Sequence, residues 1–173
     1  MTQPLIHSES TVTAAIALGS NLGNSLATLE AALERLDSLP EITVQQRSPY
    51  YRTKAVGPPQ PDYINSCALL STTLSPHGLL SVLLEVEAKF GRVRRERWAA
   101  RTLDLDLLLY GDRIVDTPDL QIPHPRMGDR AFVLIPLADL APDWVEPVSQ
   151  KTIAQLLQVV DCSGVEKMLP TSI

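Results

Sequence analysis

A pair of aspartates separated by one residue, Asp104 and Asp106, is the feature of this sequence with the plainest chemistry. Both lie in TLDLDLLLY, residues 102–110, a pattern that predicts a strand. Because side chains two positions apart in a strand share a face, the two carboxylates point to one side and the intervening leucines to the other. Carboxylate oxygens on a rigid strand suit Mg²⁺ that also binds a phosphate. The alternative is a solvated strand face paired with neighbouring arginines.

The ten residues that precede this strand are rich in arginine. Five of the 11 arginines in the chain lie there: Arg92, Arg94, Arg95, Arg97 and Arg101. A guanidinium group binds phosphate oxygens through two parallel hydrogen bonds, so the cluster beside two acids predicts a nucleoside triphosphate site. The alternative is a basic surface loop that balances an acidic protein. Trp98, in the middle of this segment, could close over a flat substrate or anchor the loop to the core.

Two further candidates lie on either side of the cluster. Glu87 lies beside the apolar stripe of a predicted helix, where its carboxylate could accept a hydrogen bond from a ribose or base, or pair with Arg92. His124 lies between two prolines in PHPR, an extended segment that suits a phosphate or metal contact. A structural role is the alternative for this histidine.

Composition limits the classes of partner. The 173 residues are 45% hydrophobic and carry a net charge of −5, which is typical of one compact globular domain. An acidic chain is a poor general nucleic-acid binder, because phosphate backbones require a basic surface. Cations gathered at 92–101 instead favour one small polyanion. We therefore expect no nucleic-acid partner.

Several other classes are excluded by what the sequence lacks. It has no GxxxxGK[ST] or GxGxxG string, so neither a P-loop nor a dinucleotide-binding fold is predicted, and no GxSxG marks a serine hydrolase. The start shows no secretory signal, and the longest apolar run, 131–138, is too short to span a bilayer. Cys67 and Cys162 resemble two free core thiols of a cytosolic protein. We expect a cytoplasmic monomer with no membrane partner.

The elements that must position these residues follow the order β-α-β-β-α-β. Strands are predicted at 12–18, 42–53, 63–73 and 102–110, and helices at 25–38 and from Ser75-Pro76 to Gly91. This order predicts an α+β, ferredoxin-like sandwich, in which two helices cover one face of a largely antiparallel sheet. A C-terminal elaboration follows, with an apolar segment at 131–138 in a proline-rich loop region and one more helix near 150–160.

The predicted domain organisation is simple. Residues 1–11 form an N-terminal extension, 12–160 a single domain, and 161–173 a C-terminal tail.

Five strings in order resemble the 6-hydroxymethyl-7,8-dihydropterin pyrophosphokinase family of folate biosynthesis. They are ALGSNLG, SPYYRT, GPPQPDYINS, GRVRRERWAARTLDLDLLLYG and IPHPRMGDRAFVLIPL, and the resemblance runs from about Thr13 to Trp144. It implies a ferredoxin-like fold and the transfer of pyrophosphate from ATP to the hydroxymethyl group of the pterin, with release of AMP.

The resemblance also implies roles for individual residues. Asp104 and Asp106 would ligate two Mg²⁺ ions that bridge the ATP phosphates, and they would be catalytic together with Arg92, Arg94 and Arg101. ATP contacts are implied for Glu87, Arg92, Arg94, Trp98, Arg101, Leu107, His124 and Arg130. The pterin ring would stack between Tyr63 and Phe132, with further contacts from Thr53, Val56, Asn65 and Trp98.

Two other functions are compatible with parts of the pattern. A metal-dependent transferase that uses a nucleotide sugar would also need an Asp-x-Asp pair, but it would release no AMP. A ferredoxin-like RNA-binding module would use the arginine loop and surface aromatics, although the acidic balance disfavours this function.

Overall fold

The computed structural model describes residues 10–55, 59–91 and 102–169. Val56, Arg92, Arg94, Trp98 and Arg101, together with the rest of the arginine cluster, lie outside the described residues.

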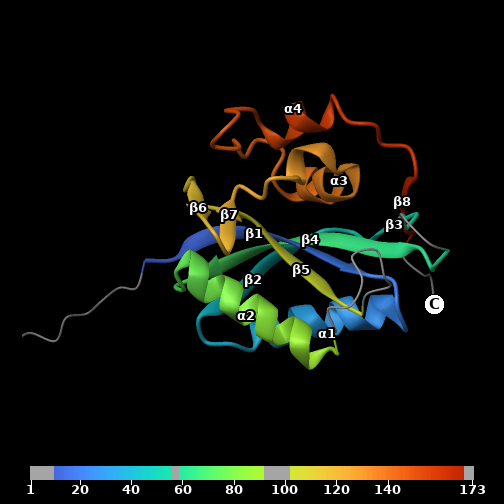
Figure 1. The fold of residues 1–173 in the computed structure, drawn as a ribbon, viewed down its shortest axis with the longest axis horizontal. Helices are drawn as coiled ribbons and strands as arrows, with labels where there is room; N and C mark the ends of the chain where they lie inside the picture. The colour runs from blue at the N-terminus through green and yellow to red at the C-terminus, as the bar shows by residue number, and fades with distance from the viewer. Residues whose placement is uncertain (1–9, 56–58, 92–101, 170–173) are drawn as a thin grey trace, which may run out of the picture.

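One six-stranded sheet forms the centre of the molecule (Figure 1). Its strand order is β5-β1-β4-β3-β8, and β2 pairs with β4 beyond the end of β3. Every pairing in this sheet is antiparallel. The strands are β1 (Val12–Ser20), β2 (Ile42–Arg47), β3 (Tyr51–Thr53), β4 (Tyr63–Thr72), β5 (Asp104–Tyr110) and β8 (Val165–Lys167).

The two faces of this sheet are covered by different parts of the chain. Helices α1 (Ser25–Asp37) and α2 (Pro76–Lys89) lie on one face, and α3 (Ala131–Leu140) and α4 (Ile153–Leu157) lie on the other (Figure 1). A small hairpin of β6 (Val115–Thr117) and β7 (Leu120–Ile122) precedes a short 3₁₀ turn, Met127–Asp129. The predicted α+β, ferredoxin-like fold with a C-terminal elaboration is confirmed.

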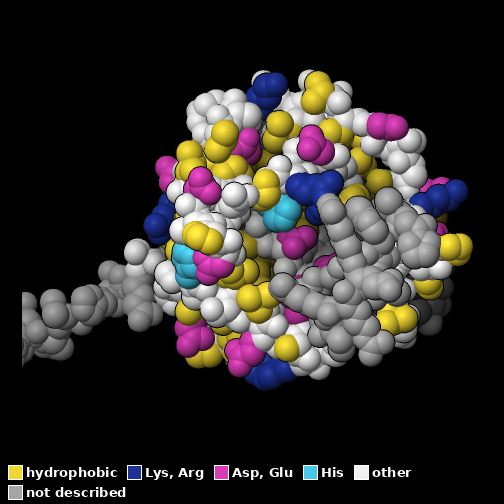
Figure 2. Space-filling view, viewed as in Figure 1, with side chains coloured by type: hydrophobic (Ala, Val, Ile, Leu, Met, Phe, Trp, Pro, Cys, Tyr) yellow, Lys and Arg dark blue, Asp and Glu magenta, His cyan; other side chains and the backbone are white. Residues whose placement is uncertain are grey.

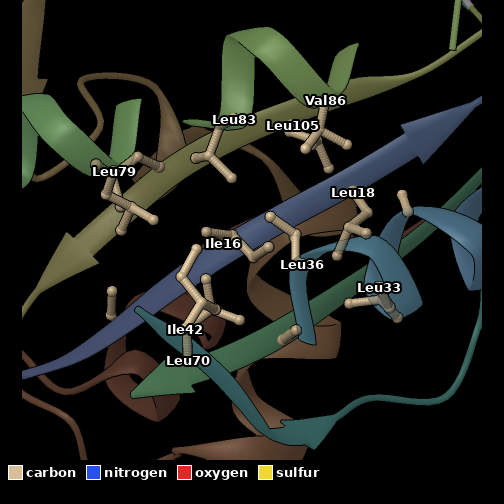
Figure 3. Packing of buried hydrophobic residues seen from close by; sticks show 14 of the residues in the cluster. Ile16, Leu18, Leu33, Leu36, Ile42, Leu70, Leu79, Leu83, Val86 and Leu105 are labelled. Atoms are coloured by element: carbon tan, nitrogen blue, oxygen red, sulfur yellow. The ribbon is translucent and has the colours of Figure 1, made fainter. Parts of the chain in front are cut away.

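The main core lies between the sheet and the helices α1 and α2, where large aliphatic side chains interdigitate (Figure 3). In β1, alternate residues divide between the two faces, because Ile16 and Leu18 pack in this core whereas Ala15 and Ala17 pack toward α3. We call these surfaces the helical face, toward α1 and α2, and the α3 face.

Capping residues begin both long helices where the sequence predicts. The Asn24 side chain accepts a hydrogen bond from Ala27 N at 3.2 Å, and the Ser75 hydroxyl accepts one from Gly78 N at 3.1 Å. Pro76 follows at the first helical position, where its missing N–H has no intrahelical partner to lose.

Three features of the C-terminal region differ from the sequence-based expectations. The segment expected as part of a proline-rich loop region forms helix α3, although Pro136 removes one backbone donor from its interior. Burial of apolar side chains against the sheet and α4 stabilises this helix. Cys162 is exposed, so its expected core position is wrong, whereas Cys67 is buried. Strand β8, in the segment predicted as a tail, pairs with β3.

No helix within the described ranges is long and apolar enough to cross a membrane.

Candidate active site

Strand register brings the predicted metal ligands and predicted pterin contacts into one row. Gly19 of β1 pairs with Asp104 of β5 on one side and with Asn65 of β4 on the other, and Asn65 pairs in turn with Tyr51 of β3. Residues paired directly across antiparallel strands project to the same face. This row therefore runs across four strands of the α3 face, from a carboxylate to an amide to a phenol.

A second row lies next to the first. Ala17 pairs with Asp106 on β5 and with Cys67 on β4, so both aspartates project to the α3 face, as the sequence predicts. Burial raises the pKa of the Cys67 thiol, and the nearby Asp106 carboxylate raises this pKa further. Ala17 lies between the acid and the thiol in this row, and both Ala17 and Cys67 pack against α3.

Glycine at position 19 keeps space open between the acids and Asn65. A Cβ atom built on Gly19 would lie 3.0 Å from Asn65 Nδ2 and 3.8 Å from Tyr63 Cδ1. The side chains of Asn65 and Tyr63 thus lean over the glycine backbone, and no other residue type fits here without moving Asn65.

Two polar atoms of this region are buried and have no hydrogen-bond partner within the described part of the chain. Asn65 Oδ1 and Thr53 Oγ1 make no hydrogen bond with any described residue, although each is almost inaccessible to solvent. Thr53 pairs with Tyr63 on β4, so it lies on the same face as Asn65. Buried polar atoms are nearly always hydrogen-bonded in folded proteins. These two oxygens are therefore suited to bind a polar ligand.

Beside Asp106, the loop before α3 supplies a histidine and an arginine. Partial burial lowers the pKa of His124, and the Asp106 carboxylate opposes that shift. Burial also lowers the pKa of the Arg130 guanidinium, again opposed by Asp106 and more weakly by Asp104. Arg130 also lies over the ring of Phe132, 5.7 Å from its centroid. Figure 2 shows histidine, basic and acidic side chains gathered near the centre of this side of the molecule.

The structure gives Glu87 a partner that the sequence did not suggest. Glu87 is 4% exposed, and its Oε2 accepts a hydrogen bond from Leu105 N at 2.8 Å. Glu87 thereby joins α2 to the strand that carries both aspartates. The Leu107 side chain lies in the core under the helical face. Its contact with ATP stays a prediction.

The chemistry of the donor set fits magnesium that is shared with a phosphate ligand. No group of three or more His, Cys, Asp and Glu side chains that could hold a metal occurs within the described ranges. Asp104 and Asp106 are thus two oxygen donors without a complete protein cage. Mg²⁺ is commonly bound by one or two carboxylates and completes its shell with water and substrate phosphates.

Some residues that shape this site are not among the ligand contacts predicted from the sequence. Among those predictions, Gly19 and Tyr51 occur only within the strings ALGSNLG and SPYYRT, and Asp139 is not singled out. The role of Gly19 depends on its pairing with Asp104 and Asn65, and a single sequence does not reveal this strand register.

Comparison with known proteins identifies the family. The model of the family 7,8-dihydro-6-hydroxymethylpterin-pyrophosphokinase (HPPK) matches residues 15–142. The chain belongs to this family. As a member of the HPPK family, it is an ATP-dependent pyrophosphokinase that transfers pyrophosphate from ATP to the hydroxymethyl group of 6-hydroxymethyl-7,8-dihydropterin, releasing AMP, in folate biosynthesis.

Relatives in the HPPK family cover most of the chain. A 2-amino-4-hydroxy-6-hydroxymethyldihydropteridine pyrophosphokinase of Synechocystis is 52% identical over 157 residues, which is 91% of this chain and 80% of that protein. The protein of the same name from Pseudomonas aeruginosa is 44% identical over 88% of this chain and 94% of its own length. A crystal structure of Plasmodium falciparum HPPK-DHPS superimposes with a TM-score of 0.68 at 16% identity, covering 90% of this chain and 46% of that one, and supports the fold alone.

Proposed function

We propose that the α3 face holds both substrates of the pyrophosphokinase reaction side by side. Asp104 and Asp106 would bind the metal-bound phosphates of ATP, and Asn65 and Thr53 would bind the pterin. The observation that carries this assignment is a pair of buried oxygens, Asn65 Oδ1 and Thr53 Oγ1, that have no hydrogen-bond partner among the described residues and lie in the same region as Asp104. Asp104 and Asn65 are separated by two strand spacings, or about 10 Å.

The hydrogen-bonding edge of a pterin is complementary to Asn65 Oδ1 and Thr53 Oγ1, which have no partner among the described residues. A pterin carries an exocyclic amino group and ring N–H groups, and Asn65 Oδ1 can accept a hydrogen bond from these donors. The Thr53 hydroxyl can donate or accept. Tyr63 and Phe132 would stack on the two faces of the ring, and Val56 and Trp98 would add further contacts, as the family resemblance implies.

ATP would lie over β5 and the loop before α3. The loop residues His124 and Arg130, both close to Asp106, would contact the phosphates. Further contacts are proposed from Glu87, Arg92, Arg94, Trp98, Arg101 and Leu107. Two Mg²⁺ ions held by Asp104 and Asp106 would neutralise phosphate charge when bound.

The residues of this chain contribute mainly position and charge to the reaction. The hydroxymethyl oxygen of the pterin attacks the β-phosphorus of ATP and loses its proton to water, the bond from that phosphorus to the α,β-bridging oxygen breaks, and AMP leaves with that oxygen. Phosphoryl-type transfer needs in-line alignment and stabilisation of developing charge more than covalent help from the protein. Asn65 and Thr53 would orient the attacking group, and the cationic side chains would stabilise charge on the leaving AMP.

The oligomeric state, the location and the domain limits of the enzyme are also proposed. We propose a monomer in the cytoplasm, with residues 12–160 as the catalytic domain and ATP and the pterin as its small-molecule partners.

Substitution of Asn65 tests the substrate assignment. We expect Asn65→Ala to raise KM for the pterin about tenfold or more, because a buried hydrogen bond to a ligand contributes about 1–3 kcal/mol. KM for ATP should stay within twofold, and AMP should remain the product. Steady-state kinetics with each substrate varied in turn provide the measurement.

Ser66→Ala is the matched control. Its hydroxyl is also buried and unpartnered among the described residues, but it belongs to the adjacent position of β4, which projects to the helical face. Equal effects of Asn65→Ala and Ser66→Ala on the pterin KM, or no effect of either, would contradict the proposed pocket.

A further inference from the structure

Tyr51 and Asp139 connect the two parts of the molecule that carry the proposed pterin pocket. The Tyr51 hydroxyl, on β3, donates a hydrogen bond to Asp139 Oδ2, near the end of α3. Tyr51 itself is only 5% exposed. Burial raises the pKa of this phenol, and the hydrogen bond to Asp139 raises it further, so the hydroxyl stays protonated and remains a donor.

One end of this hydrogen bond is next to proposed pterin contacts, and the other end lies on the helix that carries Phe132. Tyr51 pairs with Asn65 across the strands and is two residues from Thr53 on the same face. Asp139 follows Phe132 by seven residues, which is about two turns of α3, so the two side chains lie on similar sides of the helix. The contact therefore joins the strand wall of the pocket to the helix that carries its aromatic wall.

Apolar packing already attaches α3 to the sheet without this contact. Val133, Leu134 and Leu137 are buried in one cluster with Ala15, Ala17, Cys67 and Leu69. Apart from a weak hydrogen bond that Cys67 Sγ donates to Val133 O at 3.5 Å, these contacts are not directional, so they permit small shifts of the helix over the sheet. A hydrogen bond at a fixed place has a defined geometry and limits such shifts.

We propose that the hydrogen bond between Tyr51 and Asp139 positions the pterin pocket by setting the distance between Phe132 on α3 and the Thr53 and Asn65 side chains on the sheet. This inference rests on the proposed location of the pterin. Tyr51 and Asp139 are positioning residues, because each acts through neighbours that would contact the substrate.

The test removes the hydrogen bond from either side. We expect Tyr51→Phe to raise KM for the pterin about fivefold to tenfold, with kcat and KM for ATP within twofold, because a binding contribution lost equally in ground state and transition state changes KM alone. Asp139→Ala should do the same, and the double variant should be no worse than either single one. Asp139→Asn keeps an acceptor oxygen and should restore KM to within twofold or threefold of the parent.

A neighbouring tyrosine provides the matched control. Tyr50 packs against the core under the helical face, so Tyr50→Phe removes a hydroxyl of the same kind from the other side of the sheet. It should leave both KM values within twofold. Circular dichroism shows whether each variant folds. Asp139 is exposed on α3, so the Asp139 variants can test the hydrogen bond if Tyr51→Phe does not fold.

Defined outcomes overturn the inference. An unchanged pterin KM in Tyr51→Phe and Asp139→Ala, with only a lower melting temperature, would show a purely structural contact. Equal rises in both KM values, or no recovery in Asp139→Asn, would also overturn it. If Asn65→Ala raises the pterin KM in the same assay while the Tyr51 and Asp139 variants do not, the positioning role fails and the pocket stands. If none of these variants raises it, both fail.

Discussion

The two faces of the sheet are built from alternate residues of the same strands, yet they differ in size and polarity. On the helical face, β1, β4 and β5 present large aliphatic side chains, among them Ile16, Leu18, Leu70 and Leu105 (Figure 3). On the α3 face, the end of the sheet that carries the aspartates presents small or polar residues, namely Ala17, Gly19, Asn65, Cys67, Asp104 and Asp106, whereas Ala15, Leu69 and Leu109 pack under α3 farther along the strands. Large aliphatic side chains fill the helical face, whereas this end of the α3 face carries two carboxylates and two buried oxygens that have no partner among the described residues.

Because of this difference, the helical face mainly stabilises the fold and the α3 face is suited to bind ligands. Burial of each large aliphatic side chain contributes about 1.5–3 kcal/mol, so the helical face supplies much of the driving force for folding. A buried polar atom without a partner lowers stability unless a ligand satisfies it. The α3 face can retain such atoms because the other face has stabilised the sheet. Substitutions on the two faces should therefore have separable effects.

The largest effect is expected on the α3 face from Asp106→Ala. Loss of a metal-binding carboxylate should lower kcat/KM on the order of a thousandfold, because metal-assisted charge stabilisation contributes several kcal/mol. The melting temperature should stay the same or rise. AMP release at saturating Mg²⁺, together with thermal unfolding, measures both quantities. Asp116→Ala, which removes a carboxylate from the β6 strand, is the control. Near-normal turnover of Asp106→Ala would contradict the assignment of this face.

On the helical face, the next largest effect is expected from Leu83→Ala. Leu83 is fully buried in the core, so the cavity should lower the free energy of unfolding by about 2–5 kcal/mol. Both KM values should stay within twofold at temperatures where the variant is folded. Urea unfolding followed by circular dichroism measures the loss. Leu22→Ala, at an exposed leucine, should have little effect. A large rise in KM for the pterin in Leu83→Ala would show that the faces are not separable.

A smaller and more selective effect is expected from Gly19→Ala. The added methyl group would displace Asn65 and should raise Kd for the pterin about tenfold, which corresponds to about 1.4 kcal/mol, while the fold is retained. Gly128→Ala is the matched control, because no atom lies within 4 Å of a Cβ built there. Calorimetric titration with the pterin tests the change directly. Unaltered pterin binding in Gly19→Ala would remove the argument for a space kept open by this glycine.

The smallest effect is expected from Ser75→Ala, on the helical side. Loss of the cap on α2 should lower the free energy of unfolding by about 1 kcal/mol with no change in either KM. Ser81→Ala, on the exposed surface of the same helix, should be neutral or slightly stabilising. Chemical denaturation of both variants provides the measurement. A change in KM for ATP in Ser75→Ala would link the start of α2 to the nucleotide.

Local signals predicted most of the fold. Capping by Asn24 and by Ser75 with Pro76, and the leucine spacing of both helices, depend on residues close in sequence, and both helices begin as expected. Helix α3 was not predicted because Pro136 argues against a helix locally, whereas burial between the sheet and α4 favours it. The pairing of β8 with β3 joins residues more than 100 positions apart, and no local pattern indicates it.

The sequence by itself determined the residue types of the site and the face that the two aspartates share, because the period of a strand is a local property. It also determined the family, through strings such as RTLDLD and PHPRM. Only the tertiary structure decided that Gly19 lies between Asp104 and Asn65, that Glu87 binds the backbone of β5, and that Tyr51 meets Asp139. Register and contacts between distant segments arise from packing the whole chain, and spacing along the sequence does not specify them.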